Sequence, residues 1–287
     1  MSSYVIVTDS SADLSAELLA KYEIGCLQLE VTLEGDASRL NSEIEPHAFY
    51  EALRAKKSAT TSAASPATFR ETFKSYLDAG KDVLYLGFSS GLSSTYNGGF
   101  IAARELAEEY PDRKILTLDT KCAALGEGLI VLLAAKKRES GATIEETRRY
   151  IKEIRPNLAH WFTVDDLFFL KRGGRVSGTT AVVGSMLQIK PVMHVDDEGH
   201  LIKVTTARGR RASLNALVDR MKESLLDHPD QMVTIGHGDC LEDANYVADR
   251  VRAETGLEVA LIDYIGPVIG AHSGPGTVAL FFLGKER

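Results

Sequence analysis

The chain has 287 residues, of which 44% are hydrophobic and 25% charged, and its formal net charge is −7. This length suits one large domain or two of ordinary size, and the acidic balance excludes indiscriminate nucleic-acid binding, so any basic site must be local. The cysteines are isolated in the sequence, which excludes a CxxC metal motif and a disulfide framework and indicates a reducing compartment. Because no apolar run is long enough for a membrane span and the sequence opens on a strand rather than a signal peptide, we expect a cytoplasmic protein.

Strands and helices alternate up to about residue 155. Asp13 is the expected N-cap of the first helix, which holds Leu18 and Tyr22, and residues 35–45 are polar and typical of a surface loop. The alternation predicts a parallel sheet with helices on both faces. The expected strands cover residues 4–7, 26–33, 83–88 and 114–118, and the other expected helices cover 47–55, 66–76, 94–107, 125–137 and 143–154.

Polar residues follow three of these strands. They are residues 9–11, 89–95 and 119–120. In a parallel sheet, ligands bind beyond the carboxyl ends of the strands, so one rim of the sheet would collect all three segments.

The segment 89–95 contains hydroxyls at Ser89, Ser90, Ser93, Ser94 and Thr95, directly before a helix. We call this segment the hydroxyl loop. A helix N-terminus offers unpaired N–H groups and a favourable dipole, so hydroxyls placed there form an anion site. The alternative is that Ser93 or Ser94 only caps the helix.

The pattern changes after residue 157, where hairpins mix with helices and suggest a second, α+β domain. A hairpin is expected around the turn at 196–199, and glycine ends a short helix at 167–175. The remaining expected helices cover 178–188, 213–226 and 241–254, and the expected strands cover 161–164, 189–195, 201–207, 232–236, 258–264 and 277–283.

Residues 87–91 match the G-x-S-x-G pattern of the α/β-hydrolase nucleophile elbow, with Ser89 as the nucleophile. Asp263 and His272 follow in the chain order that a catalytic triad requires. Against this hypothesis, the helix starts near Ser94 rather than directly after Ser89, and no oxyanion loop precedes the motif. A serine esterase remains the alternative function.

His272 stands in a segment, 266–276, that is rich in glycine and proline. The glycines permit close approach of a ligand to this histidine, although a lone histidine is more often structural. Two basic clusters, at 171–175 and 208–211, are either solvated turns or a local patch for phosphate or an acidic partner. The sequence has no Walker A loop, no GxGxxG and no HExxH motif, so we expect no nucleotide cofactor and no metal.

Taken together, these motifs resemble the DegV family of bacterial fatty-acid-binding proteins, and the matches run in order along nearly the whole chain. They are Val7-Thr-Asp-Ser-Ser-Ala-Asp-Leu14, Thr61-Ser62 with Ser65-Pro66, Ser89-Ser-Gly-Leu-Ser-Ser-Thr-Tyr96, Leu170-Lys-Arg-Gly-Gly-Arg-Val176, Lys190-Pro191 and Gly266-Pro-Val-Ile-Gly-Ala-His-Ser-Gly-Pro-Gly-Thr277.

The resemblance implies an α/β fold in two domains. Residues 1–156 would form a three-layer α/β/α domain with a parallel sheet, and residues 157–287 a two-layer α+β domain with a mixed sheet. A long-chain fatty acid would lie between them. Thr61, Ser93 and His272 would donate hydrogen bonds to its carboxylate, with Ser62 and Ser94 as secondary candidates.

The resemblance further implies a carrier without catalytic residues or cofactors, which presents the acid to a separate ATP-dependent fatty acid kinase. We expect a monomer that makes transient contact with a membrane and binds no nucleic acid. Two departures from the family pattern, Ala63-Ala64 and Ser94, leave the head-group geometry and the choice of acyl chain open. The candidates for contact with the kinase or the phosphate are Arg172, Arg175, Arg208, Arg210 and Arg211.

Overall fold

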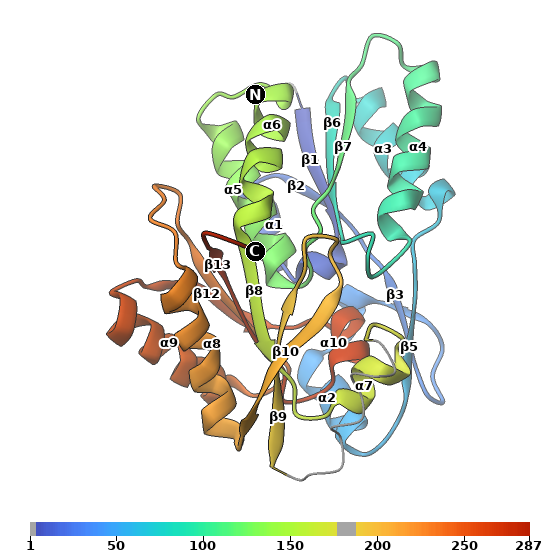
Figure 1. Cartoon of the computed structure of the whole chain (residues 1–287). Coiled ribbons are helices and arrows are strands. Elements are labelled where there is room, and N and C mark those ends of the chain that lie inside the picture. The colour runs from blue at the N-terminus through green and yellow to red at the C-terminus, as the bar shows by residue number, and fades with distance from the viewer. Residues whose placement is uncertain (1–3, 177–187) are drawn as a thin grey trace.

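The computed structural model describes residues 4–176 and 188–287, and two separate large sheets organise this part of the chain (Figure 1). The first half contributes a four-stranded parallel sheet and the second half a six-stranded mixed sheet. The α/β architecture that the sequence predicts, a parallel sheet followed by a mixed one, is confirmed.

The parallel sheet has the order β2–β1–β6–β7. All six residues of β1 are buried, because α3 and α4 cover one face of the sheet and α5 and α6 cover the other (Figure 1). The strands are β1 (Tyr4–Asp9), β2 (Ile24–Leu27), β6 (Asp82–Gly87) and β7 (Ile115–Asp119). The helices are α3 (Pro66–Asp78), α4 (Thr95–Glu109), α5 (Leu125–Glu139) and α6 (Ile144–Ile154).

The mixed sheet has the order β10–β9–β8–β13–β11–β12, and only β11 and β12 pair in parallel. The predicted hairpin is confirmed as β9 and β10. Helices α8 and α9 cover the outer face of the sheet (Figure 1). The strands are β8 (Leu158–Thr163), β9 (Ile189–Val195), β10 (Leu201–Arg208), β11 (Val233–His237), β12 (Val259–Tyr264) and β13 (Val278–Leu283), and the helices are α8 (Arg210–Ser224) and α9 (Leu241–Thr255).

Helix α5 joins the two halves. It packs against β1 of the parallel sheet and against β8, β11 and β13 of the mixed sheet. Its residues from Leu125 to Ala135 are all buried, Glu127 among them, as expected for a helix packed on both sides. The site described below therefore lies between sheets that share one central helix.

A small antiparallel sheet, β4–β3–β5, corrects the prediction for residues 26–33. This run does not form one strand, because the Ser10 hydroxyl accepts the N–H of Leu29 at 3.0 Å, directly beyond β2. The expected loop at 35–45 contains β4 and a 3₁₀ turn. The elements concerned are β3 (Glu30–Leu33), β4 (Arg39–Leu40), β5 (Ala59–Ser62) and the turn η2 (Asn41–Glu43).

Asp13 is not the N-cap of α1 (Ala16–Lys21), which is Ser15, whose hydroxyl accepts the N–H of Leu18 at 3.3 Å. Asp13 has a left-handed φ of 52° and accepts the N–H of Gly266 at 3.0 Å, so it connects the two halves. The other short elements are the 3₁₀ turns η1 (Ser10–Ala12) and η3 (Arg155–Asn157) and the helices α2 (Pro46–Arg54) and α7 (Leu167–Arg172).

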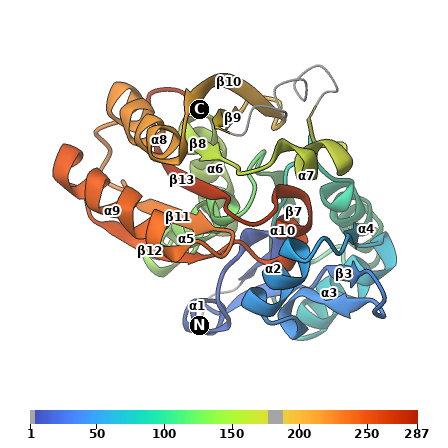
Figure 2. The same cartoon turned by 90° about the horizontal axis from the view of Figure 1, so that it is seen from below.

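The glycine-rich segment contains a helix, α10 (Pro267–Ser273), that the sequence does not predict. Figure 2 shows α10 beside α2, and Gly270 permits this packing because a Cβ there would lie 2.6 Å from the Tyr50 hydroxyl oxygen. The helix predicted at 178–188 falls almost wholly outside the described residues. None of the helices in residues 4–176 and 188–287 has the length and apolar composition that crossing a membrane requires.

Candidate functional site

A cavity of about 300 Å³ lies between the two halves of the chain, and its wall is mostly apolar. It falls at the carboxyl ends of β1 and β6, where the sequence predicts a ligand site. Its lining consists of Ser11, Leu29, Thr61, Ser62, Ala63, Phe88, Leu92, Ser93, Ser94, Thr95, Ala123, Ala124, His160, Phe162, Leu170, Arg175, Val195, Leu201, Ile265, Val268, Ile269, His272, Ser273, Thr277, Ala279 and Phe281.

The residues of the wall differ in exposure, and we call the more exposed, hydroxyl-bearing part of the wall the polar end of the cavity. Ser62 and Ser94 are exposed, and Thr61, Ser93 and His272 are half-buried. The aromatic residues that β8 and β13 contribute to the wall, Phe162 and Phe281, are buried. An elongated ligand with one polar end would therefore place that end among the hydroxyls.

Thr61 and His272, which are 211 positions apart in the sequence, meet at this polar end, with 2.7 Å between Thr61 Oγ1 and His272 Nε2. β5 positions the threonine and α10 positions the histidine. Burial, together with the charges of Arg175 and Arg172, lowers the pKa of His272 to about 4. The imidazole is therefore neutral at neutral pH, with one ring nitrogen as donor and the other as acceptor.

Thr61 therefore has a neighbouring base in His272, a direct contact that the sequence does not reveal. A base with a pKa of about 4 nevertheless accepts a proton poorly at neutral pH. The pair is better suited to hydrogen bonding than to activating a nucleophile.

Ser93 lies in the turn that leads into α4. Its Oγ lies 2.9 Å from Thr95 Oγ1 and accepts the N–H of Thr95 at 3.2 Å, whereas the side chain of Ser94 makes no capping bond. Ser93 therefore accepts the first N–H of α4 from the position before the N-cap residue, Ser94, and it also lines the cavity, so the two interpretations of the hydroxyl loop are compatible.

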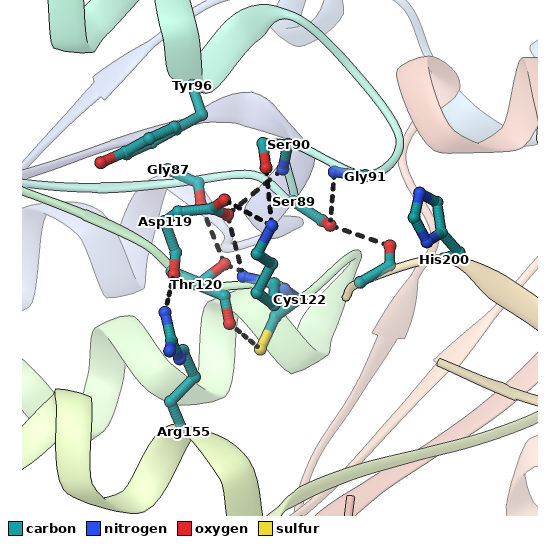
Figure 3. Close-up of polar contacts among 12 residues, drawn as sticks. Gly87, Ser89, Ser90, Gly91, Tyr96, Asp119, Thr120, Cys122, Arg155 and His200 are labelled. Atoms are coloured by element: carbon teal, nitrogen blue, oxygen red, sulfur yellow. Dashed lines mark hydrogen bonds and ion pairs between the residues drawn. The ribbon is translucent and has the colours of Figure 1, made fainter. Parts of the chain in front are cut away.

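The triad that the G-x-S-x-G pattern requires does not form. Ser89 is completely buried, and its hydroxyl donates to the carbonyl of Gly199 at 2.8 Å and accepts the N–H of Gly91 at 3.2 Å (Figure 3). The histidine of the proposed triad, His272, bonds to Thr61, and Asp263 accepts the N–H of Tyr264 at 2.7 Å. Ser89 instead holds the tip of the β9–β10 hairpin against the hydroxyl loop.

Of the five arginines singled out from the sequence, only Arg175 lines the cavity. Its Nε donates to the carbonyl of Leu92 at 3.2 Å, and burial lowers the pKa of its guanidinium. Arg172 stacks over the ring of Phe169, with 5.1 Å from Cζ to the ring centroid.

The three arginines of the 208–211 cluster lie outside the cavity lining. Arg210 makes an ion pair with Asp243 at 2.7 Å, and Arg211 lies 3.7 Å above the ring centroid of Tyr246. Arg208 is exposed at the end of β10.

Sequence reasoning missed several polar residues of the wall, among them His160 and Ser273. Burial lowers the pKa of His160 well below its usual value, and both ring nitrogens have partners, the N–H of Ala123 at 3.3 Å and the carbonyl of Leu158 at 3.0 Å. Only the alternation of side chains along β8 could have indicated that His160 faces inward. Within the described ranges, no cluster of three His, Cys, Asp or Glu side chains is arranged to hold a metal ion.

Comparison with protein families gives one result for nearly the whole chain. The model of the DegV family matches residues 3–285. A DegV domain-containing protein from Clostridium perfringens is 42% identical over 289 aligned residues, which cover 100% of this chain and 99% of the relative.

Solved structures with the same fold include proteins described as lipid binders. A stearic-acid-binding protein from Eubacterium ventriosum aligns with a TM-score of 0.89 at 25% identity and covers 98% of each chain. A DegV lipid-binding protein from Thermotoga maritima aligns with a TM-score of 0.84 at 30% identity and covers 99% of each chain.

Proposed function

This chain belongs to the DegV family, and on that premise we propose that it binds one long-chain fatty acid in the cavity between its two halves. The acyl chain lies inside and the carboxylate lies at the polar end. The observation that carries the proposal is the Thr61–His272 hydrogen bond in the wall of a mostly apolar cavity that Ser93 also lines.

The balance of free energies supports this ligand. Burying about 14 methylene groups at roughly 0.8 kcal/mol each contributes at most about 11 kcal/mol to binding. Burial of the carboxylate opposes binding by several kcal/mol unless the charged group is hydrogen-bonded. Charge-assisted bonds from hydroxyl groups offset that cost, at about 1.5–3 kcal/mol each.

The neutral imidazole explains how Thr61 can serve as a donor. When His272 carries its proton on Nε2, it donates to Thr61 Oγ1, and the threonine hydroxyl hydrogen is then available to the carboxylate. In this arrangement His272 supports the carboxylate through Thr61, in place of the direct hydrogen bond that the resemblance implies. Ser93 supplies the second hydroxyl, and Ser62 and Ser94 are secondary donors at the exposed rim.

We further propose that the protein performs no chemistry of its own and presents the acid to a separate ATP-dependent fatty acid kinase in the cytoplasm. Arg175 at the polar end and the neighbouring Arg172 would face the acyl phosphate. The cluster at 208–211 would contact the kinase. The division into domains at 1–156 and 157–287 and the monomeric state stay predictions, as does transient membrane contact.

Lipid extraction and native mass spectrometry of the freshly purified protein test fatty-acid binding. We expect one bound acid per chain, and about 100-fold weaker binding in the double variant Thr61→Ala/Ser93→Ala, because two charge-assisted hydrogen bonds are lost. Ser90→Ala is the matched control, since Ser90 belongs to the same loop but does not line the cavity. A protein that contains no fatty acid and binds none on titration would refute the proposal.

The kinase step has a separate test. The loaded protein is mixed with a bacterial fatty acid kinase and ATP, and acyl phosphate is trapped with hydroxylamine. We expect Arg175→Gln to lose product while it retains fatty acid. Equal product formation by this variant would contradict the role assigned to Arg175.

A further inference from the structure

Ser273 is the last residue of α10, next to His272, and it is one of the residues that line the cavity. The residue is only 6% exposed. Its hydroxyl oxygen has no hydrogen-bond partner among the described residues, although its backbone carbonyl accepts the hydroxyl of Thr277 at 3.0 Å.

A buried hydroxyl without a partner destabilises a folded protein, because the group has lost its hydrogen bonds to water and has gained none in return. Alanine at this position would remove the unfavourable group and keep the helix, since alanine has the highest helix propensity. A serine here is therefore explained when something outside the chain completes its hydrogen bond.

Thr163 provides an internal comparison. Its Oγ1 is also buried without a partner, and the residue is completely inaccessible to solvent. Thr163 lies on β8 but does not line the cavity, so no ligand in the cavity can reach it. Of these two residues with an unpaired hydroxyl, only Ser273 lines the cavity.

We propose that Ser273 is a further ligand-binding residue, whose hydroxyl makes a hydrogen bond with an oxygen atom of the bound acid. This inference rests on the proposed function, because it needs a ligand in the cavity. The oxygen belongs either to the carboxylate or to a hydroxyl substituent near the carboxylate on the acyl chain. In both cases Ser273 recognises an oxygen atom in a cavity whose wall is mostly apolar and includes Phe162 and Ala279.

The first measurement uses protein stripped of lipid and compares melting temperatures. Ser273→Ala and Thr163→Val each delete an unpaired hydroxyl, so we expect each variant to melt about 2 °C higher than the wild type. A fall in the melting temperature of Ser273→Ala would mean that its hydroxyl is already bonded within the protein, and would overturn the proposal.

The second measurement titrates the same proteins with octadecanoic acid and with 3-hydroxyoctadecanoic acid. A loss of about tenfold in affinity for both acids in Ser273→Ala identifies the carboxylate as the partner, and a loss for the hydroxy acid alone identifies the chain hydroxyl. Thr163→Val should bind both acids like the wild type.

Unchanged affinity of Ser273→Ala for both acids would overturn the proposal, and so would an equal loss in Thr163→Val, which would point to a packing effect. A wild-type protein that binds neither acid would instead refute fatty-acid binding itself. The two failures are therefore distinguishable.

Discussion

The contact between Ser89 and Gly199 makes a strong prediction about the hairpin tip. Gly199 has a φ of +85°, and a Cβ at this position would overlap the Ser89 hydroxyl oxygen and lie 3.0 Å from Cδ of Lys121. Gly199→Ala therefore combines backbone strain with the loss of the bond from Ser89 Oγ to the Gly199 carbonyl.

The expected loss of stability follows from these two contributions. Alanine in the left-handed region costs about 1 kcal/mol relative to glycine. Separating the hairpin from Ser89 leaves a buried hydroxyl without its acceptor, which costs a further 1–3 kcal/mol or so. We therefore expect the free energy of unfolding to fall by about 3 kcal/mol, measured by urea denaturation.

Gly141→Ala is the matched control. Gly141 has a φ of +90°, but a Cβ there would have no atom within 4 Å, so this variant reports the backbone strain alone. In the double variant Ser89→Ala/Gly199→Ala the overlapping oxygen is absent, so the two substitutions should cost less than the sum of their separate effects. The reasoning is wrong if Gly199→Ala costs no more than Gly141→Ala.

Two further substitutions test the polar end and the joint between the halves. Because the pKa of His272 is lowered to about 4 in the folded state, against about 6.5 in the unfolded chain, stability should fall as the pH drops through this window, by at most about 3 kcal/mol. In His272→Gln, the free energy of unfolding measured with urea should therefore fall less steeply towards acid pH than in the wild type. Some pH dependence remains in both proteins, because the pKa of His160 is also lowered by burial. Parallel pH curves for the variant and the wild type would contradict this role of His272. Tyr50→Phe should cost about 1–2 kcal/mol in the same assay, since the buried Tyr50 hydroxyl donates to the carbonyl of Ile265 at 2.7 Å, and an unchanged stability would refute that role.

The sequence predicts those parts of the fold in which local pattern and tertiary environment agree. The alternation of apolar strands and helices identifies the parallel sheet, and the polar strand ends identify the rim on which Ser93 lies. The hairpin turn is recognisable because Gly199 occupies the left-handed position that the turn needs.

Two short elements of the site lack such signals. β5, Ala-Thr-Thr-Ser, is a polar strand that pairs with β3. The sequence pattern does not separate β3 from β2, because it predicts one strand over 26–33. α10 contains Gly270 and begins at Pro267, directly after Gly266, so its composition indicates a loop. Packing against α2 stabilises this helix, and such long-range contacts are not visible in local propensity. Thr61 and His272 could therefore be named from a family resemblance, but their 2.7 Å contact could not.

One turn of backbone in the hydroxyl loop both positions Ser93 and holds the β9–β10 hairpin tip. The carbonyl of Ser89 accepts the N–H groups of Leu92 at 3.0 Å and Ser93 at 3.2 Å, and the hydroxyl of Ser89 holds the carbonyl of Gly199. The residues on either side of that hairpin tip, Val195 and Leu201, line the cavity.

The same turn thus fixes both a proposed carboxylate donor and part of the apolar wall. A nucleophilic serine needs a free hydroxyl next to a base, whereas Ser89 has both its hydrogen and a lone pair in use. The G-x-S-x-G sequence in this fold therefore positions the hairpin at the cavity. Close packing at the tip demands small residues, because a Cβ at Gly91 would lie 2.8 Å from the carbonyl oxygens of Glu198 and Gly199.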